Sequence, residues 1–457
     1  MYRNSLNSPK GRTARTGIWA LLLLPLLPVS SDAQEARRRW ERMNQMRREK
    51  FDVVLPEVMR ENGIDMWITM RREGLDDPLT PDFGPGYVNP IGYYVFTDRG
   101  GERIERAALG IGGYLLAGNG AYDIVTGNFD LREFVAERDP GRIGLNMGSN
   151  IGAADGLSHT GYQHLAETLG EPWASRFVSA EKLVSDFRAR RVASEIAGFA
   201  EAGEISRELA ERALSNEVVT PGVTTLRDVA WWLMDRLLER GLGSSFGFPS
   251  IYITGPEGIE ATSSDRIIQG GDVMMIDWGV CHLNFCTDMK RVAYVMRPGE
   301  TEAMPGVQNA FDRAIEAREV SRRAIRPGIT ARENMDRIGA ALTAAGFNPI
   351  PFNQPTDGPQ TDVTWEGHHS VGNLGHGIGP SIATWNPRRL TFEVVPTNLL
   401  AIEMFAYTAV PEWGGAKLRV PLEDDAVVTE RGAEWLYPAN SRLLLIKSDP
   451  AAGRTVS

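Results

Sequence analysis

The chain has 457 residues, of which 42% are hydrophobic and 24% are charged, an ordinary balance for a soluble globular protein. This length exceeds what one hydrophobic core usually organises, so we expect two domains. The formal net charge is −10, and an acidic surface repels phosphate backbones. Composition and charge therefore argue against a nucleic-acid partner.

The first 33 residues have the pattern of a secretory signal sequence. A basic start precedes an apolar run over residues 18–29, and Ser31-Asp32-Ala33 offers small residues at the cleavage positions. The apolar run is shorter than the roughly 20 residues that a membrane-spanning helix needs. We therefore predict a signal peptide over residues 1–33 and a periplasmic or secreted mature protein with no membrane attachment. An anchor that stays uncleaved is the alternative.

Residues 34–185 are predicted to form a first domain of α/β type. Helical spacing of apolar residues over 35–62 is followed by short strand patterns at 65–70, 93–97 and 142–146, and by a helical pattern at 162–169. The segment 77–90 is rich in Pro, Gly and Asp and is predicted to be a loop.

A second domain is predicted over residues 186–446, in which helix, helix and strand hairpin occur twice. Helical patterns cover 193–216 and the residues after Thr225, and they recur at 307–325 and after Thr330. Thr225 and Thr330 are each followed three residues later by an acid, which is typical of a capped helix start. Hairpins are expected at 273–296 and over 400–429. Two such halves predict an α+β fold with a curved sheet, outer helices and hairpins that face a shared cavity.

The first hairpin carries two acidic residues on apolar strands. Asp277 interrupts the apolar run 275–280, and a buried carboxylate is costly unless it is paired, hydrogen-bonded or bound to a metal. Asp277 and Asp288 are equidistant from a turn centred on His282-Leu283. We therefore expect them to stand opposite each other, close enough to require a cation between them.

The second hairpin repeats this pattern. Glu403 lies within the apolar run 400–405, and Glu423 follows Pro421-Leu422. The two glutamates are symmetric about Trp413, which precedes the turn-like Gly414-Gly415. They are predicted to be cross-strand partners.

Histidines between the hairpins complete the candidate site. His376 lies in a glycine-rich stretch that lets the backbone pass close to a site, so we predict it as a metal ligand. Four carboxylates and one imidazole suit Mn, Co, Fe or Zn, and the ligand types do not choose among these metals. His369 is the preferred candidate for a proton carrier, and a histidine that hydrogen-bonds a metal ligand is the alternative.

Four segments together resemble metallopeptidase family M24, which includes methionine aminopeptidase, aminopeptidase P, prolidase and creatinase. They are IDWG (276–279) with CTDMKR (286–291), LGHGIG (374–379), AIEMF (401–405) and PLEDDAVVTERG (421–432). The resemblance implies a pita-bread catalytic domain after a smaller creatinase-like domain. It implies two divalent ions, which we expect to be Mn. Asp277 would bind one ion and His376 and Glu403 the other, with Asp288 and Glu423 bridging them.

The resemblance also implies roles in catalysis and binding. Glu403 would take a proton during hydrolysis, and Arg419 would hold a carboxylate, although the family arginine usually stands nearer to the last glutamate. Two histidines usual in the family are absent here, since the segment 258–262 has none and residue 383 is alanine. Dimers are common in the creatinase-like branch, so a homodimer is expected.

Three functions remain open from the sequence. The first is an exported dinuclear-metal hydrolase of peptide or amide bonds, resembling an Xaa-Pro aminopeptidase or prolidase, with a peptide or small amide as substrate. The second is a metal-binding but inactive homologue that acts as a binding module, which the absent histidines favour. The third is a metal-free, creatinase-like hydrolase of a small C–N compound. Cys281 and Cys286 could form a disulfide or remain two thiols.

Overall fold

The computed structural model describes residues 32–256, 258–260, 265–372 and 376–448. The predicted signal peptide lies almost wholly outside the described residues and stays a prediction. None of the helices in these ranges is both long and apolar enough to cross a membrane. The chain divides into a unit that ends at Glu41 and a compact unit from Arg42 onward.

The described part of the first unit is the start of helix α1 (Asp32–Glu61). Glutamate and arginine side chains pair along it at helical spacing, as between Arg37 and Glu41 at 2.8 Å. The helical pattern predicted over 35–62 is therefore one continuous helix, even though Pro56 lies inside it.

The second unit begins with a six-stranded sheet of order β4-β3-β2-β1-β5-β6. Its strands are β1 (Met66–Arg72), β2 (Tyr87–Thr97), β3 (Glu105–Gly112), β4 (Ile124–Thr126), β5 (Ile143–Leu145) and β6 (Phe177–Ser179). The accompanying helices are α2 (Thr80–Phe83), α3 (Tyr114–Ala117), α4 (Leu131–Ala136), α5 (His159–Leu169) and α6 (Glu181–Ala189). An aromatic core that includes Phe51, Trp67 and Phe187 packs on one face of this sheet.

The prediction of a loop over 77–90 is wrong in two places. A short helix, α2, starts at Thr80 with Pro81 in its first turn, where a missing amide hydrogen costs nothing. Strand β2 already begins at Tyr87, because Tyr87 and Val88 pair with Gly112 and Ile111 of β3.

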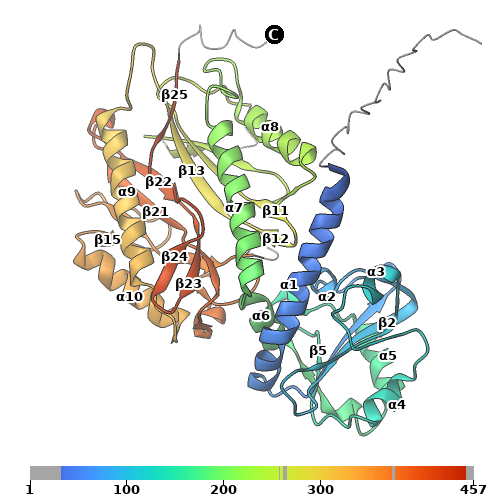
Figure 1. The fold of residues 1–457 in the computed structure, drawn as a ribbon. Coiled ribbons are helices and arrows are strands. Elements are labelled where there is room, and N and C mark those ends of the chain that lie inside the picture. Colours follow the sequence, from blue (N-terminus) through green and yellow to red (C-terminus); the bar gives the residue numbers. More distant parts are fainter. Residues whose placement is uncertain (1–31, 257, 261–264, 373–375, 449–457) are drawn as a thin grey trace, which may run out of the picture. The chain divides into compact units, whose positions relative to one another are not determined.

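Four long helices organise the second part of the chain, as Figure 1 shows. They are α7 (Ala193–Ala213), α8 (Leu226–Glu239), α9 (Pro305–Ala324) and α10 (Ala331–Ala344). The predicted helix starts are confirmed, because the Thr225 and Thr330 hydroxyls accept a hydrogen bond from the backbone amides of Asp228 and Glu333. The carboxylates of Asp228 and Glu333 in turn accept one from the threonine amides. Helix α9 packs against β21 (Met404–Ala409) and β22 (Lys417–Leu422), with Val307 and Phe311 in the same core as Ala406.

The strands of this part form several ladders rather than one curved sheet. One ladder has the order β25-β13-β10-β8-β9, with β8 (Ser250–Gly255), β9 (Gly258–Glu260), β10 (Val273–Trp278), β13 (Met289–Val295) and β25 (Leu444–Ile446). A short one joins β7 (Gly243–Ser244), β11 (Val280–His282) and β12 (Phe285–Cys286).

The other half of the repeat supplies three more ladders. They are β15-β16-β21-β22, β18-β17-β20-β23-β24 and β14-β19. The new strands are β14 (Ile329–Thr330), β15 (Asn348–Pro349), β16 (Asp362–Thr364), β17 (Gly367–Ser370), β18 (Ser381–Ala383), β19 (Glu393–Val394), β20 (Leu399–Ala401), β23 (Asp425–Thr429) and β24 (Gly432–Trp435). Isolated bridges between Lys290 and Glu423 and between Cys286 and Gly372 link the two halves, and the first lies at the candidate site.

Candidate metal centre

The first hairpin has a register that differs from the predicted one. Asp277 of β10 lies opposite Lys290 of β13, not opposite Asp288. The turn is formed by Leu283 and Asn284, whose φ angles of 58° and 112° suit a tight two-residue hairpin turn. Because this turn is one residue further along than the one we predicted, every cross-strand partner moves by two residues. Asp288 stays on the same face, since side chains alternate with a period of two.

A disulfide between Cys281 and Cys286 closes this turn. The two cysteines are cross-strand partners in β11 and β12. The sequence did not decide between a disulfide and two thiols, and the structure has the disulfide.

The second hairpin has the predicted register. Met404 pairs with Leu422, and the next backbone contact joins Ile402 to Asp424, so Glu403 and Glu423 stand between these pairs opposite each other. The turn includes Gly414, in the left-handed region with a φ of 67°. The prediction that these glutamates are cross-strand partners is confirmed.

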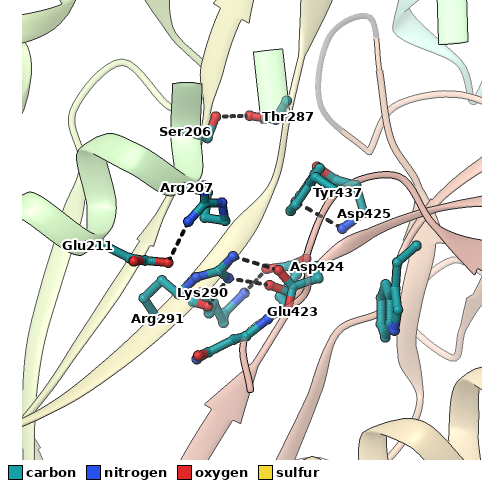
Figure 2. A network of polar contacts seen from close by, with 12 residues as sticks. Ser206, Arg207, Glu211, Thr287, Lys290, Arg291, Glu423, Asp424, Asp425 and Tyr437 are labelled. Carbon is teal, nitrogen blue, oxygen red and sulfur yellow. Dashed lines mark hydrogen bonds and ion pairs between the residues drawn. The ribbon is translucent and has the colours of Figure 1, made fainter. Parts of the chain in front are cut away.

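Lys290 lies among these carboxylates, as Figure 2 shows for its approach to Glu423. Its Nζ atom is 2.8 Å from Glu403 Oε1 and 3.2 Å from Asp277 Oδ2, and it also donates to Glu423. Sequence reasoning missed this residue. The available signal was a charged residue within the apolar strand 289–295, on the same face as Asp288.

His369 of β17 faces the other side of the carboxylates. Its Nε2 atom is 3.4 Å from Glu423 Oε1 and 3.8 Å from Asp288 Oδ2. Its Nδ1 atom is 3.1 Å from the backbone carbonyl of Ser370, a contact that places the ring proton on Nδ1 and leaves the Nε2 lone pair toward the acids.

A cation fits between Asp288, His369 and Glu423. One ligand atom from each lies within 4.8 Å of the others, and all three side chains are buried. Asp288 Oδ1 and Glu423 Oε1 are buried without a hydrogen-bond partner among the described residues. Two carboxylates and an imidazole are suitable ligands for a divalent transition metal.

His376, the predicted ligand, lies outside this cluster. It is exposed, and its ring centre is 5.1 Å from that of His369 and 5.2 Å from that of Trp385. The structure thus brings Asp288 and Glu423 together with His369, and it brings Asp277 and Glu403 to Lys290. The five-residue ligand set remains a prediction.

Burial and neighbouring charges perturb the titration of the acids. Burial raises the pKa of Asp277 to about 6 and that of Asp288 well above its usual value. Burial also acts to raise the pKa of Glu423, but Lys290 and His369 outweigh it and lower this pKa to about 2. The protein alone therefore does not compensate the charges of all these acids, and Asp277 and Asp288 are shifted toward their protonated forms.

A second layer of polar contacts fixes the segment that carries Glu423. Asp424 pairs with Arg291 at 2.8 Å and with Arg318 at 2.6 Å, and Asp425 accepts a hydrogen bond of 3.0 Å from the Tyr437 hydroxyl. Figure 2 shows Arg291, Asp424, Asp425 and Tyr437 around Glu423. Because each neighbouring acid has its own partner, Glu423 is left to face the cluster.

Arg419 lies on β22 opposite Tyr407 of β21. Its guanidinium is 3.8 Å from the centre of the Phe405 ring, and its Nε is buried without a hydrogen-bond partner among the described residues. Phe405 also lies 5.8 Å from Lys290 Nζ, so Arg419 stands one aromatic ring away from the carboxylates.

A family model described as metallopeptidase family M24 matches residues 197–430, which contain every residue of this centre. The chain belongs to this family. This M24 chain is a metallopeptidase with a pita-bread catalytic domain after an N-terminal domain.

Curated relatives and solved structures agree with the family. The M24 chain is 26% identical to an Xaa-Pro dipeptidase of Pyrococcus furiosus over 59% of its own length and 68% of the relative. It is 23% identical to an uncharacterised peptidase of Bacillus subtilis, over 64% and 76% of the two chains. An X-Pro aminopeptidase of Thermotoga maritima has the same fold, with a TM-score of 0.61 at 19% identity over 85% of this chain and 99% of that one.

Proposed function

We propose that the chain is an exported metal-dependent peptidase that cleaves bonds between an amino acid and proline. The observation that carries this proposal is the buried cluster of Asp288, His369 and Glu423 inside an M24 fold, in which each of the two acids has one oxygen without a hydrogen-bond partner among the described residues. Relatives described as Xaa-Pro dipeptidases support the substrate class.

The metal ion, Glu403 and Arg419 have separate roles in the proposed reaction. A bound divalent ion supplies Lewis acidity toward a peptide carbonyl. Glu403 would take a proton from water, a role that the family resemblance implies; its side chain is 18% exposed and its Oε2 lies 3.7 Å from His369 Nε2. Arg419 has a free Nε beside the Phe405 ring and is suited to hold the carboxylate of a short substrate.

Export is supported by two independent features. The first is the signal pattern over residues 1–33, and the second is the disulfide between Cys281 and Cys286. Disulfides persist mainly in oxidising compartments, such as the periplasm or the extracellular space. A periplasmic or secreted location and a homodimer remain our expectations.

The number and kind of metal ions are part of the proposal. The family resemblance predicts two divalent ions, with Mn as our expectation. Lys290 already neutralises one charge among the four carboxylates, which raises the question of how many ions the site holds.

A binding module without activity is the second candidate. It is favoured by Ala383, because peptidases of the family usually have a histidine at this position. Ala383 is buried on β18, opposite Gly367. Without that imidazole, a bound peptide would lack a usual proton donor near the site.

The test is metal-dependent cleavage of an Xaa-Pro dipeptide and of a longer peptide with proline at its second position. We expect Mn²⁺ to activate the purified chain and Asp288→Ala to abolish cleavage, because Asp288 offers a buried ligand atom to the metal. Asp52→Ala is the control, since this largely exposed acid belongs to the N-terminal region. A chain that binds metal and peptide without cleaving either substrate would support the binding module instead.

A further inference from the structure

Lys290 reaches the centre of the site from a fixed backbone position. Its amide nitrogen donates to the Glu423 carbonyl at 3.1 Å, and its Cα lies opposite that of Asp277. The side chain is 7% exposed. A buried side chain held between two strands in this way has little freedom to turn out of the site.

The lysine ammonium is fully used by protein carboxylates. An ammonium ion has three N–H donors, and three acids lie within ion-pair distance of this one: Asp277, Glu403 and Glu423. These are acids to which the family resemblance gives a metal. Each therefore already has a cationic partner in the structure.

A metal ion could not share these oxygens without moving the lysine. Carboxylate oxygens bind transition metals at about 2.0–2.2 Å, whereas Nζ is 2.8 Å from Glu403 Oε1 and 3.2 Å from Asp277 Oδ2. An ion bound to the same oxygens would come into contact with Nζ. It would also be repelled by the ammonium charge at a separation where little screening is possible.

The remaining ligand atoms lie on the other side of Glu423. Its Oε2 accepts from Lys290, while its Oε1 faces His369 Nε2 at 3.4 Å. Asp288 Oδ1 and Glu423 Oε1 lack hydrogen-bond partners within the described ranges. The centre is therefore divided into one half that holds the Lys290 ammonium and one half, formed by Asp288, His369 and Glu423, whose ligand atoms lie within 4.8 Å of one another.

We propose that Lys290 takes the place of one of the two cations, so that the chain binds a single divalent ion through Asp288, His369 and Glu423. This rests on the proposed metal-dependent function and makes it a one-metal enzyme. Lys290 is a positioning residue, since its three donors are engaged and none is left for a substrate. Glu423 then joins a metal to an ammonium ion rather than a metal to a second metal.

The test counts Mn²⁺ ions bound to the purified metal-free chain after saturation and gel filtration, by elemental analysis. The wild-type chain is expected to hold one ion, with the six-line electron paramagnetic resonance spectrum of an isolated Mn²⁺. Lys290→Ala and Lys290→Thr remove the ammonium and open space, so each is expected to hold two ions with the spectrum of a coupled pair.

Lys417→Ala is the matched control, because Lys417 is another lysine paired with an acid, with its side chain 10% exposed and 2.6 Å from Asp362 Oδ2, but it lies outside the centre. It should hold one ion. Two ions, or none, on the wild-type chain would overturn the proposal even if both Lys290 variants failed to fold. The count uses no substrate, so it stands apart from the cleavage test: peptide cleavage with two wild-type ions would uphold the peptidase and reject the role of Lys290.

Discussion

At the scale of single residues, the centre depends on which imidazole faces the acids. His369 is 2% exposed and has its Nδ1 atom held by a backbone carbonyl, whereas His376 is exposed beside Trp385. Burial acts to lower the pKa of His369, but Glu423 outweighs it and raises this pKa, so protons and a metal ion compete for Nε2.

We expect His369→Ala to weaken Mn²⁺ binding by at least about 100-fold, because it removes a ligand atom rather than a neighbour of one. His376→Ala should change the affinity little and serves as the matched control. Isothermal titration of the metal-free proteins with Mn²⁺ measures both. The opposite ranking would return the ligand role to the histidine of the glycine-rich stretch.

At the scale of elements, the first hairpin places Asp277, Asp288 and Lys290 on one face. The two strands cross closely at Gly279, between the acids. A Cβ atom at this position would lie 1.8 Å from the carbonyl oxygen of Thr287 and 2.5 Å from Ser245 Oγ. Because the nearest atom belongs to the backbone, the strands would have to separate.

Gly279→Ala is therefore expected to destabilise the chain by roughly 1–3 kcal/mol and to weaken Mn²⁺ binding. Gly101→Ala is the control, since no atom lies within 4 Å of a Cβ built there. Its effect should stay within about 0.5 kcal/mol. Urea unfolding followed by circular dichroism measures both variants. Equal stability would show that the strands tolerate a side chain at residue 279.

At the scale of the whole molecule, the chain is acidic and also buries acids away from the metal centre. Asp77 is 3% exposed and accepts hydrogen bonds from the Leu79 amide at 2.8 Å and the Asn146 side chain at 2.9 Å. Burial outweighs these bonds and raises the pKa of Asp77 from 3.8 to about 6. The folded state therefore keeps this proton over a pH range where the unfolded chain has lost it.

The sign of the pH effect follows. Below pH 3.8 Asp77 is protonated in both states, and between pH 3.8 and about 6 only the folded state retains the proton, so stability falls as pH rises. Asp77→Asn cannot titrate. We expect the unfolding free energy of the wild type, relative to this variant, to fall by roughly 2 kcal/mol from pH 4 to pH 7. Urea unfolding at several pH values measures it, and parallel curves for the two proteins would contradict the prediction.

Interactions between residues close in sequence made part of this structure predictable from the sequence. The helices that begin after Thr225 and Thr330 could be predicted because a capping box involves residues only three apart. Asp277, Asp288, Glu403 and Glu423 were detectable because each is an acid in or beside an apolar strand, where burial demands a partner. The register of the second hairpin was predictable because Glu403 and Glu423 are symmetric about a turn marked by two glycines.

Tertiary structure decided what the sequence left open or placed elsewhere. The register of the first hairpin depends on its turn residues, Leu283 and Asn284, which have positive φ although neither is glycine. The symmetry of the two aspartates in the sequence therefore predicted the turn at the wrong residues. Lys290 meets Glu403 and Glu423 across 113 and 133 residues of chain. Such contacts follow from how two hairpins pack, and so does the choice of His369 over His376. The sequence by itself determined which acids stand in or beside the apolar strands of the site, because that depends on local pattern, whereas packing alone determined which cation each of them faces.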